Sequence, residues 1–435
     1  MRVLVVGGGA REHALAWKLA GEPGVAAVTC APGNAGIAAT TRCVPVAADD
    51  PRAVCDLVDR DRIDFTVVGP EQPLTLGLVD LLSREGHPCC GPTRAAARLE
   101  SSKAFAKNIM QAAQVPTARH VSCESPEQAR EVARKSPFGY PLVLKADGLA
   151  AGKGVVIAPD ALAAESCIRE MMVDRRFGDA GARVVVEECL QGREASFFVL
   201  TDGEHARVLP SAEDHKRAFD GDEGPNTGGM GAFSPSPLID APTAERVLET
   251  IVFPTLRGMK AAGYAYRGFL YCGLMMTADG PKVIEFNARM GDPETQVVMP
   301  ALDEDLLPHM VDANRGALKS GTFRARSERH VGVVMASGGY PDRFETGKAI
   351  GGLDAVAARP DTWVFHAGTA LKAGALVTSG GRVLTVVGRG VDFEAARARA
   401  YAAVAGITFD GVHYRRDIGK RAVSPAGCRG WSPGD

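Results

Sequence analysis

Two lysines and a glycine-rich loop come together at residues 142–158, whose sequence is LVLKADGLAAGKGVVIA. Lys145 follows an apolar run, and the loop carries Lys153 between Gly152 and Gly154. Glycine permits backbone conformations that turn N–H groups toward an anion, and lysine adds positive charge for phosphate oxygens. We therefore predict a nucleotide-phosphate site. A plain hairpin turn is the alternative for this segment taken alone.

The spacing of this loop does not match a P-loop. That motif has four residues between its glycines and a Ser or Thr after its lysine. Here Gly148 and Gly152 enclose three residues, and Gly154 follows Lys153. The phosphate site must therefore belong to another kind of nucleotide-binding fold.

A candidate metal site lies in the segment 281–287, PKVIEFN. Side chains alternate along a strand, so Glu285 and Asn287 are predicted on one face, with Ile284 and Phe286 on the other. Two hard oxygen donors without a nearby His or Cys suit magnesium, which also takes ligands from water and substrate phosphates. The exposed face of an edge strand is the alternative for this pair alone.

Charged residues follow both this strand and an earlier one. Arg289, Asp292 and Glu294 come directly after the metal-site strand, and a loop this charged after an apolar strand favours a functional site. The segment 182–197, ARVVVEECLQGREASF, ends its apolar run in a Glu pair. Backbone at such a strand end could bind adenine, and a carboxylate there could accept ribose hydroxyls. Solvated surface charge is the alternative for this pair and for the DHKR run at 214–217.

Composition limits the possible partners. The chain has 435 residues, which predicts two to four domains, and its 50 basic and 52 acidic residues give a net charge of −2. No general positive field would attract nucleic acid or an anionic membrane. The 10 cysteines contain no CxxC pair, and no long apolar run or leader-like segment occurs. We expect a soluble, cytoplasmic protein.

The first hundred residues alternate short apolar runs with helical patterns, which predicts a parallel, Rossmann-like βαβ sheet. Three loops, GGGAREH, APGNAG and GPEQP, should emerge at its carboxyl edge, where such sheets bind ligands. A dinucleotide is disfavoured because Glu12 stands where the third glycine is needed and the next strand ends in Ala31 and Pro32 rather than an acid. A phosphate over the helix N-terminus fits better.

We expect an α/β and α+β multidomain protein. Its predicted parts are a Rossmann-like domain at 1–102, a central domain at 107–314 and a smaller α/β domain at 327–423. The Gly-, Pro- and Ser-rich segment 424–435 is predicted to be a disordered tail. The patterns predict helices at 11–20, 51–60, 74–84, 101–111, 162–172 and 393–404, and strands that include 268–277 and 282–287.

Taken together, these segments resemble the ATP-grasp superfamily and, within it, the phosphoribosylamine–glycine ligase (glycinamide ribonucleotide synthetase) family. The resemblance spans nearly the whole chain and is carried by GGGAREHALAW, APGNAG, VGPEQPL, LESSKAF, VLKADGLAAGKGV, DHKRAFDGDEGPNTGGMGAFSP, GFLYCGLM, VIEFNARMGDPETQ and GVVMASGGYP. The long run from DHKR to GAFSP distinguishes this family from other ATP-grasp ligases. The implied central domain is an ATP-grasp domain.

The resemblance implies ligation of glycine to 5-phosphoribosylamine in purine biosynthesis. ATP would phosphorylate the glycine carboxylate, and the sugar amine would attack the acyl phosphate, giving glycinamide ribonucleotide, ADP and phosphate. ATP is then the cosubstrate, with Mg²⁺ or Mn²⁺ as the metal. The partners are small molecules, without nucleic acid or membrane, and we expect a monomer. No nucleophilic side chain is needed, because phosphoryl transfer depends on positioning and charge neutralisation.

The resemblance also implies roles for individual residues. Arg289, Lys145 and Asp214 are the catalytic candidates, and Glu285 and Asn287 are the metal ligands. ATP would contact Lys103, Lys145, Gly152, Lys153, Gly154, Glu187, Leu190 and Glu194, with the lysine loop closing over it. Glycine and the sugar phosphate would contact Gly8, Gly9, Arg11, Glu12, Gly33, Asn34, Glu71, Asp214, Lys216, Asn226, Gly228 and Gly229.

Two alternatives remain open from the sequence. One is another ATP-grasp carboxylate–amine ligase with a different acid substrate, and the other is a non-catalytic nucleotide-binding protein of the same fold. Two departures from the family pattern also stand out. Gly8 and Ala10 occupy positions where relatives often have a polar residue and a third glycine. The segment 268–277 lacks the second acidic metal ligand of many ATP-grasp relatives.

Overall fold

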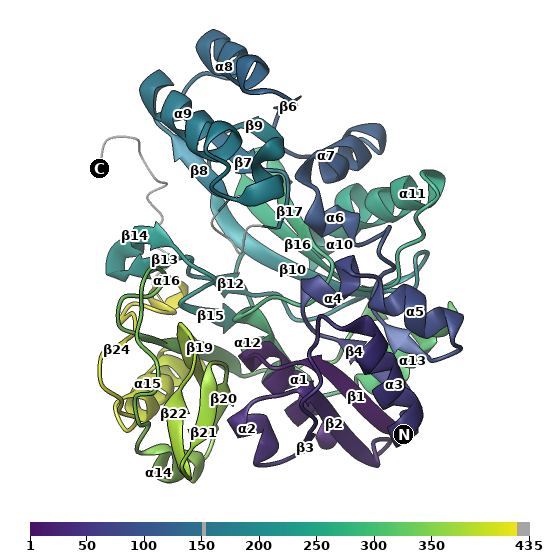
Figure 1. Cartoon of the computed structure of the whole chain (residues 1–435), viewed down its shortest axis with the longest axis vertical. Coiled ribbons are helices and arrows are strands. Elements are labelled where there is room, and N and C mark those ends of the chain that lie inside the picture. The colour runs from purple at the N-terminus through teal and green to yellow at the C-terminus, as the bar shows by residue number, and fades with distance from the viewer. Residues whose placement is uncertain (150–153, 424–435) are drawn as a thin grey trace.

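The computed structural model describes residues 1–149 and 154–423, so Gly152, Lys153 and the predicted tail lie outside the described residues. Figure 1 shows three sheet-containing regions that meet near the middle of the molecule. The N-terminal region holds a five-stranded parallel sheet in the order β3-β2-β1-β4-β5, which confirms the predicted sheet. Its strands are β1 (Arg2–Gly7), β2 (Ala27–Pro32), β3 (Arg42–Cys43), β4 (Phe65–Val68) and β5 (Cys89–Cys90).

Alternation along β1 divides the core between the two faces of this sheet. Val3 and Val5 lie in one hydrophobic cluster with α1, whereas Leu4 and Val6 lie in another with α3 and α5. The helices are α1 (Ala10–Ala20), α2 (Ala35–Ala38), α3 (Pro51–Asp61), α4 (Glu71–Thr75) and α5 (Leu78–Arg84).

Two predicted helices were wrong at their bounds. The expected helix 74–84 is divided into α4 and α5, because Gly77 has a φ of +85°, which ends one helix and starts the next. The expected helix 101–111 begins instead at Lys103, as α7 (Lys103–Ala112). Ser102 is extended and caps α7 by accepting a hydrogen bond from the Phe105 N–H, and the short α6 (Arg98–Ser101) precedes it.

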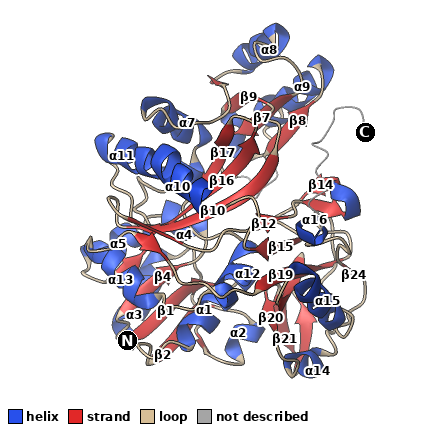
Figure 2. Cartoon of the chain, turned by 180° about the vertical axis from the view of Figure 1, so that it is seen from behind, coloured by secondary structure: helices blue, strands red, loops and turns tan. Residues whose placement is uncertain are grey.

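The central region contains two mainly antiparallel sheets, seen from both sides in Figures 1 and 2. The four-stranded sheet has the order β6-β9-β7-β8, and the five-stranded sheet has the order β17-β16-β10-β11-β18. The first comprises β6 (His120–Cys123), β7 (Leu142–Ala146), β8 (Val155–Ala158) and β9 (Val184–Glu188), with α8 (Pro126–Lys135), α9 (Ala161–Ile168) and a π-helical turn at Arg169–Val173. The predicted helix 162–172 thus ends as a π-helix.

The five-stranded sheet carries the predicted metal-site strand at its edge. It comprises β10 (Arg193–Thr201), β11 (Ala206–Val208), β16 (Gly268–Thr277), β17 (Gly280–Asn287) and β18 (Gly321–Thr322). Beside it lie α10 (Ala241–Val247), a π-helical turn at Leu248–Val252 and α11 (Phe253–Ala261). A bulge interrupts β17, since Gly273 pairs with Glu285 while the adjacent Leu274 pairs with Val283. Strict alternation was therefore wrong at Ile284: Val283 and Phe286 both enter the core.

The C-terminal sheet is completed by strands from the middle of the chain. Its order is β12-β15-β19-β23-β20, and β24 (Val412–His413) also pairs with β19. The two early strands, β12 (Glu213–Asp214) and β15 (Gly231–Ser234), join β19 (Arg329–Ser337), β20 (Thr362–His366) and β23 (Arg382–Gly390). The segment between the early strands therefore lies at the junction of the central and C-terminal regions.

The remaining elements are distributed over all three regions. They are the hairpin β13 (Arg217–Phe219) and β14 (Glu223–Asn226), the hairpin β21 (Thr369–Lys372) and β22 (Ala375–Thr378), and the helices α12 (Glu294–Ala301), α13 (Leu307–Arg315), α14 (Leu353–Ala357), α15 (Phe393–Val404) and α16 (Lys420–Val423). Two short 3-10 turns lie at Gly178–Ala182 and Asp220–Asp222. Among the described residues, no helix has the length and apolar character needed to span a membrane.

The packing of α15 against β23 generates a stability prediction. A Cβ at Gly388 would lie 2.4 Å from the carbonyl oxygen of Ala396 and 2.5 Å from the amide nitrogen of Ala400. Gly388→Ala should lower the free energy of unfolding by about 1–3 kcal/mol, because the helix must move away from the strand. Gly24→Ala is the control, since nothing lies within 4 Å of a Cβ there. Equal melting temperatures for the two variants would contradict the close packing.

Candidate active site

Asp147 brings Lys103 and Lys145 together at the end of β7. Its carboxylate accepts hydrogen bonds from the Ala104 N–H at 2.7 Å and the Ser102 hydroxyl at 3.0 Å, which joins the start of α7 to the strand end. The Lys103 ammonium then donates to the Gly148 carbonyl at 3.3 Å. Burial lowers the pKa of Lys103, and nearby Lys145 adds to this effect, whereas Glu285 opposes it. The two lysines are therefore close enough for the charge of Lys145 to act on Lys103.

Lys145 also shares a buried carboxylate with a lysine that the sequence analysis missed. One oxygen of Glu187 lies 3.1 Å from the ammonium of Lys145 and 3.1 Å from that of Lys107. Lys107 additionally donates to the Thr117 hydroxyl at 2.9 Å, and burial lowers its pKa to about 8 despite the opposing effect of Glu187. The other Glu187 oxygen is buried and has no hydrogen-bond partner in the described structure. A buried acceptor of this kind fits a ligand donor.

The predicted metal ligand Glu285 interacts with the same lysines. Gly273 pairs with Glu285 and Tyr271 pairs with Asn287, so the bulge leaves these two side chains in alternating register and on the same face. Within residues 1–149 and 154–423, no hydrogen bond or ion pair holds either side chain. Burial opposes ionisation of Glu285, but Lys216, Lys145 and Lys103 together hold its pKa below the usual range. A charged carboxylate and an amide oxygen, both without hydrogen-bond partners among the described residues, fit a magnesium ion.

The DHKR run at 214–217 interacts with the same charged side chains. Its interpretation as plain surface charge was therefore wrong. The Lys216 ammonium lies 2.6 Å from a carboxylate oxygen of Glu194. Burial acts to lower the pKa of Lys216, but Glu194, Asp214 and Glu285 outweigh it and hold the pKa well above its usual value. Burial raises the pKa of Asp214, and Glu194 raises it further. These charges are therefore close enough to interact strongly.

Glu294 was not among the predicted site residues, although the sequence placed it in the charged loop after β17. Its side chain is buried and accepts a hydrogen bond from the Ser196 hydroxyl at 3.1 Å. That hydroxyl is also 3.2 Å from the Tyr271 hydroxyl. Burial raises the pKa of Glu294 to about 7, and Asp214 contributes to this shift. A carboxyl group with this pKa can lose its proton near neutral pH.

The loop GGGAREH at the start of α1 is held in shape by the carboxylate of Glu12. One Glu12 oxygen accepts from the Gly9 N–H at 2.7 Å, and the other accepts from the Arg11 guanidinium at 2.5 Å. The Glu12 carboxylate is thus occupied by protein donors. Gly8 lies against the next predicted loop, since a Cβ there would be 2.5 Å from the Gly33 carbonyl oxygen. The two loops therefore form one surface at the N-terminus of α1.

Asn34 holds this surface against the C-terminal region. Its side-chain amide donates to the carbonyl oxygens of Gly8 at 2.9 Å and His366 at 2.7 Å. Its side-chain oxygen accepts from the N–H groups of Gly36 and Ile37 and so caps α2. Both the amide group and the oxygen of the Asn34 side chain are hydrogen-bonded to protein atoms. A ligand here would therefore contact backbone groups.

Arg289 connects the loop after β17 to two acids of the N-terminal part. Its guanidinium lies 3.1 Å from a carboxylate oxygen of Glu71 and 2.8 Å from one of Glu100. Burial opposes ionisation of Glu71, but Arg289 and Arg11 lower its pKa to about 2. Glu100 was missed by the sequence analysis. It also accepts from the Ala288 N–H at 2.7 Å, which fixes the loop as well as the guanidinium.

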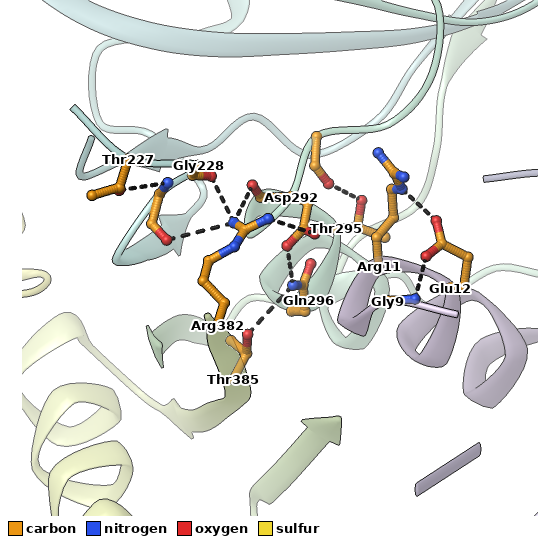
Figure 3. A network of polar contacts seen from close by, with 12 residues as sticks. Gly9, Arg11, Glu12, Thr227, Gly228, Asp292, Thr295, Gln296, Arg382 and Thr385 are labelled. Atoms are coloured by element: carbon orange, nitrogen blue, oxygen red, sulfur yellow. Dashed lines mark hydrogen bonds and ion pairs between the residues drawn. The ribbon is translucent and has the colours of Figure 1, made fainter. Parts of the chain in front are cut away.

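Arg382 holds the glycine-rich loop that contains Gly228 in place, as Figure 3 shows. Its guanidinium donates to the carbonyl oxygen of Gly228 at 2.6 Å and to that of Asp292 at 2.8 Å. It also pairs with the Asp292 carboxylate at 2.9 Å. Gly229 has a φ of +110°, and a Cβ there would lie 2.4 Å from Pro293. Arg382 therefore joins β23, the glycine loop and the charged turn.

Other predicted residues take less central positions. The carbonyl oxygen of Gly154 accepts from the Ala146 N–H at 2.8 Å, which pairs the far side of the lysine loop with β7. Leu190 is half-buried just after β9. Asn226 lies on the β13–β14 hairpin opposite Arg217, and no contact in the described residues brings its side chain into the lysine cluster.

The three regions match three domains of one family. Residues 1–100 match the N domain of phosphoribosylglycinamide synthetase, residues 101–295 match its ATP-grasp (A) domain, and residues 330–421 match its C domain. The phosphoribosylamine–glycine ligase of Ralstonia nicotianae is 50% identical over 97% of this chain and 100% of the relative.

Solved structures agree with the fold. The structure of the phosphoribosylamine–glycine ligase from Thermotoga maritima has a TM-score of 0.81 and 36% identity, covering 96% of this chain and 100% of that chain. The biotin carboxylase of Campylobacter jejuni has a TM-score of 0.73 with 17% identity, covering 98% of this chain and 95% of that chain. At that identity the second likeness concerns the fold alone.

The buried Glu294 generates a pH-dependent stability prediction. Because its folded-state pKa is raised, the folded protein keeps this proton longer than the unfolded chain, and its contribution to stability falls as pH rises from the usual Glu range to about 7. Glu294→Gln should therefore be more stable than the wild type by about 3 kcal/mol at about pH 8, and near equal at about pH 4. Chemical denaturation at both pH values would measure this.

The exposed Glu249 supplies a control, because its replacement by Gln leaves no buried charge behind. Glu249→Gln should change the free energy of unfolding little at either pH. A Glu294→Gln variant whose stability relative to the wild type is the same at both pH values would contradict the raised pKa.

Proposed function

Because the chain belongs to the phosphoribosylglycinamide synthetase family, we propose a division of its phosphoribosylamine–glycine ligase activity among three groups of side chains. This activity belongs to purine biosynthesis and uses ATP. ATP phosphorylates the carboxylate of glycine, which forms an acyl phosphate and releases ADP. The amine of 5-phosphoribosylamine then attacks the acyl carbon and displaces phosphate. The observation that carries the division is the cluster of lysines around Glu285, whose carboxylate has no hydrogen bond or ion pair among the described residues.

The first group binds ATP. Lys103 and Lys145 converge on one position, where they neutralise phosphate charge during transfer. The partner-free oxygen of Glu187 is suited to accept from an adenine amino group, with Leu190 against the base and Glu194 toward the ribose. Lys107 holds the Glu187 carboxylate in place. The proposed contacts of Gly152 and Lys153 concern residues outside the described structure.

Glu285 and Asn287 would hold Mg²⁺ or Mn²⁺. The metal would supply Lewis-acid stabilisation of phosphate oxygens and a template for the nucleotide. The chain's own contribution is to place both donors on one face of β17, where no described residue binds them. Lys216, Lys145 and Lys103 keep the carboxylate ionised before any ligand arrives.

The second group surrounds the transferring phosphoryl group and glycine. Arg289 has donors left after its contacts with Glu71 and Glu100, and its guanidinium would stabilise the phosphoryl oxygens. Asp214 would accept from the glycine ammonium, with Lys216 balancing the extra negative charge. The Gly228 and Gly229 loop, held by Arg382, would shape the space for so small an amino acid. Asn226 stays a weaker candidate.

The third group binds the sugar phosphate. The N–H groups at the start of α1 and the Arg11 side chain offer positive charge to a phosphate, with Gly8, Gly9 and Gly33 allowing close approach. Glu12 and Asn34 would hold the loops in shape rather than touch the phosphate. Glu71 would accept from a sugar hydroxyl while remaining paired with Arg289.

We also propose that one chain in the cytoplasm is the working unit, with domains at 1–102, 107–314 and 327–423. Each proposed domain supplies part of the site: Glu71 and Arg11 from the first, the lysine cluster from the second and Arg382 from the third. The partners in this proposal are small molecules, without nucleic acid or membrane.

The decisive experiment is an assay for ADP with glycine and freshly made 5-phosphoribosylamine. Turnover should require ATP, a divalent metal, glycine and the sugar amine together, because the acyl phosphate is consumed only by the amine. Formate and bicarbonate in place of glycine are the controls. Steady turnover without the sugar amine, or with another acid, would favour a different ATP-grasp ligase, and no turnover at all would favour a binding protein.

Replacement of the proposed metal ligand gives a second prediction. Glu285→Ala should lower kcat/KM at least about 100-fold while the protein remains folded, since no hydrogen bond or ion pair among the described residues holds the side chain. Asp279→Ala, in the exposed turn before the same strand, is the matched control. The ADP assay at saturating and limiting Mg²⁺ measures both. Turnover of Glu285→Ala near the wild-type value at limiting Mg²⁺ would exclude the assignment.

A further inference from the structure

Three potential metal ligands of different types meet on the outer side of the N-terminal sheet. They are Cys55 and Asp59 of α3 and His87, which lies between α5 and β5. One ligand atom from each lies within 4.8 Å of the other two. The His87 Nε2 and an Asp59 carboxylate oxygen are 3.1 Å apart. Neither the ligase activity nor the roles proposed above use any of these residues.

Local structure fixes all three side chains. Residues four apart on a helix lie one turn apart on the same face, so α3 stacks Asp59 on Cys55. Asp50 caps α3 by accepting from the Ala53 N–H, and Pro51 occupies its first turn. The ligand pair therefore stands on a well-formed helix.

His87 is placed by the end of α5. Gly86 adopts a φ of +83°, its N–H donates to the Ser83 carbonyl at 3.2 Å, and the His87 N–H donates to the Leu82 carbonyl at 2.8 Å. These two bonds form a Schellman motif, which sets the direction of the chain after the helix. Leu82 and Val58 belong to the same hydrophobic cluster, so α3 and α5 are held together beneath the ligands.

The chemistry of this cluster suits zinc. Zinc binds thiolate, imidazole and carboxylate ligands at about 2.0–2.3 Å, so the ligand atoms of a tetrahedral site lie about 3.5 Å apart. Small side-chain rotations would bring the observed separations to that value. The surroundings of the Cys55 thiol are also negative overall, because Asp59, Glu85 and Asp56 outnumber Arg52. Three protein ligands would leave the fourth position to water.

We propose that Cys55, Asp59 and His87 bind one Zn²⁺ ion, which ties α3 to the end of α5. Asp59 and His87 are open to solvent with side chains 63% and 19% exposed, so the metal can enter over the buried thiol. β4 starts shortly after α3 and β5 starts shortly after His87, which places the cluster at the amino ends of these strands. The substrate loops follow the carboxyl ends of β1, β2 and β4. The zinc site is thus separate from the ligase site.

Cobalt substitution tests this proposal directly, because Co²⁺ bound to a thiolate absorbs in the near ultraviolet and Co²⁺ bound only to oxygen does not. Titration of the full-length, reduced protein with Co²⁺ should give this band at one equivalent, and Zn²⁺ should abolish it. Excess Mg²⁺ should leave it unchanged, since magnesium prefers oxygen ligands. Cys55→Ser should lose the band, and His87→Ala should weaken Co²⁺ binding at least about tenfold.

Cys189→Ser is the matched control, because this half-buried thiol lies far along the chain and should keep the band. The band would overturn the proposal if it were absent from the wild type or persisted in Cys55→Ser. Zn²⁺ should also raise the melting temperature of the wild type, since a ligand that binds the folded state stabilises it. Asp59→Asn, which changes an exposed side chain, should reduce this rise. An equal rise in both proteins would mean adventitious binding only.

Discussion

The site depends on the placement of buried positive charges next to buried negative charges. Lys103, Lys107, Lys145 and Lys216 are placed among Glu187, Glu194 and Glu285, and an isolated buried charge of either sign would cost several kcal/mol. The arrangement favours the charged forms of Glu285 and Lys216 before a substrate arrives. Glu285 keeps a lowered pKa because lysines surround it, and Lys216 keeps a raised pKa because acids surround it. Preorganised charges of this kind need little rearrangement during phosphoryl transfer.

Two arginines, Arg289 and Arg382, connect residues from different domains around the site. Arg289 binds Glu71 and Glu100, and Arg382 binds the Gly228 carbonyl and Asp292. Each guanidinium presents several donors in a fixed plane, so it can hold acceptors from different chain segments at once. Loops that carry little apolar surface are thereby fixed without a hydrophobic core of their own. The proposed glycine and sugar-phosphate contacts depend on these two arginines as much as on the loops themselves.

Local patterns in the sequence were sufficient for much of the fold. The parallel N-terminal sheet, the strand at 268–277 and the helix at 393–404 follow from periodicity alone. The same patterns could place Glu285 and Asn287 on one face but not the bulge at Ile284, which depends on pairing with β16. Gly77 divides a helix that looked continuous, because its positive φ is set by the turn into α5.

The missed site residues share a physical reason. Lys107 and Glu100 lie within helical patterns where a charged residue normally marks the solvent face, and only tertiary contacts reveal that they are buried. Arg382 is the first residue of β23, and its partners Gly228 and Asp292 are separated from it by 154 and 90 residues. No local spacing can signal contacts of that range. The charged turn at Glu294, by contrast, was visible in the sequence.

The C-terminal sheet combines strands from two distant parts of the chain. This affects how the chain can fold and whether it can be cut into fragments. β12 and β15 are synthesised well before β19, and β15 pairs with β19 along Gly231–Ser234. Until β19 emerges, the edge of β15 has no partner and could pair with another chain. Formation of this sheet must also close a long loop, which slows folding. A fragment that ends before β19 would carry an open strand edge beside the glycine loop, so the ATP-binding region cannot be cut out cleanly at the apparent domain boundary.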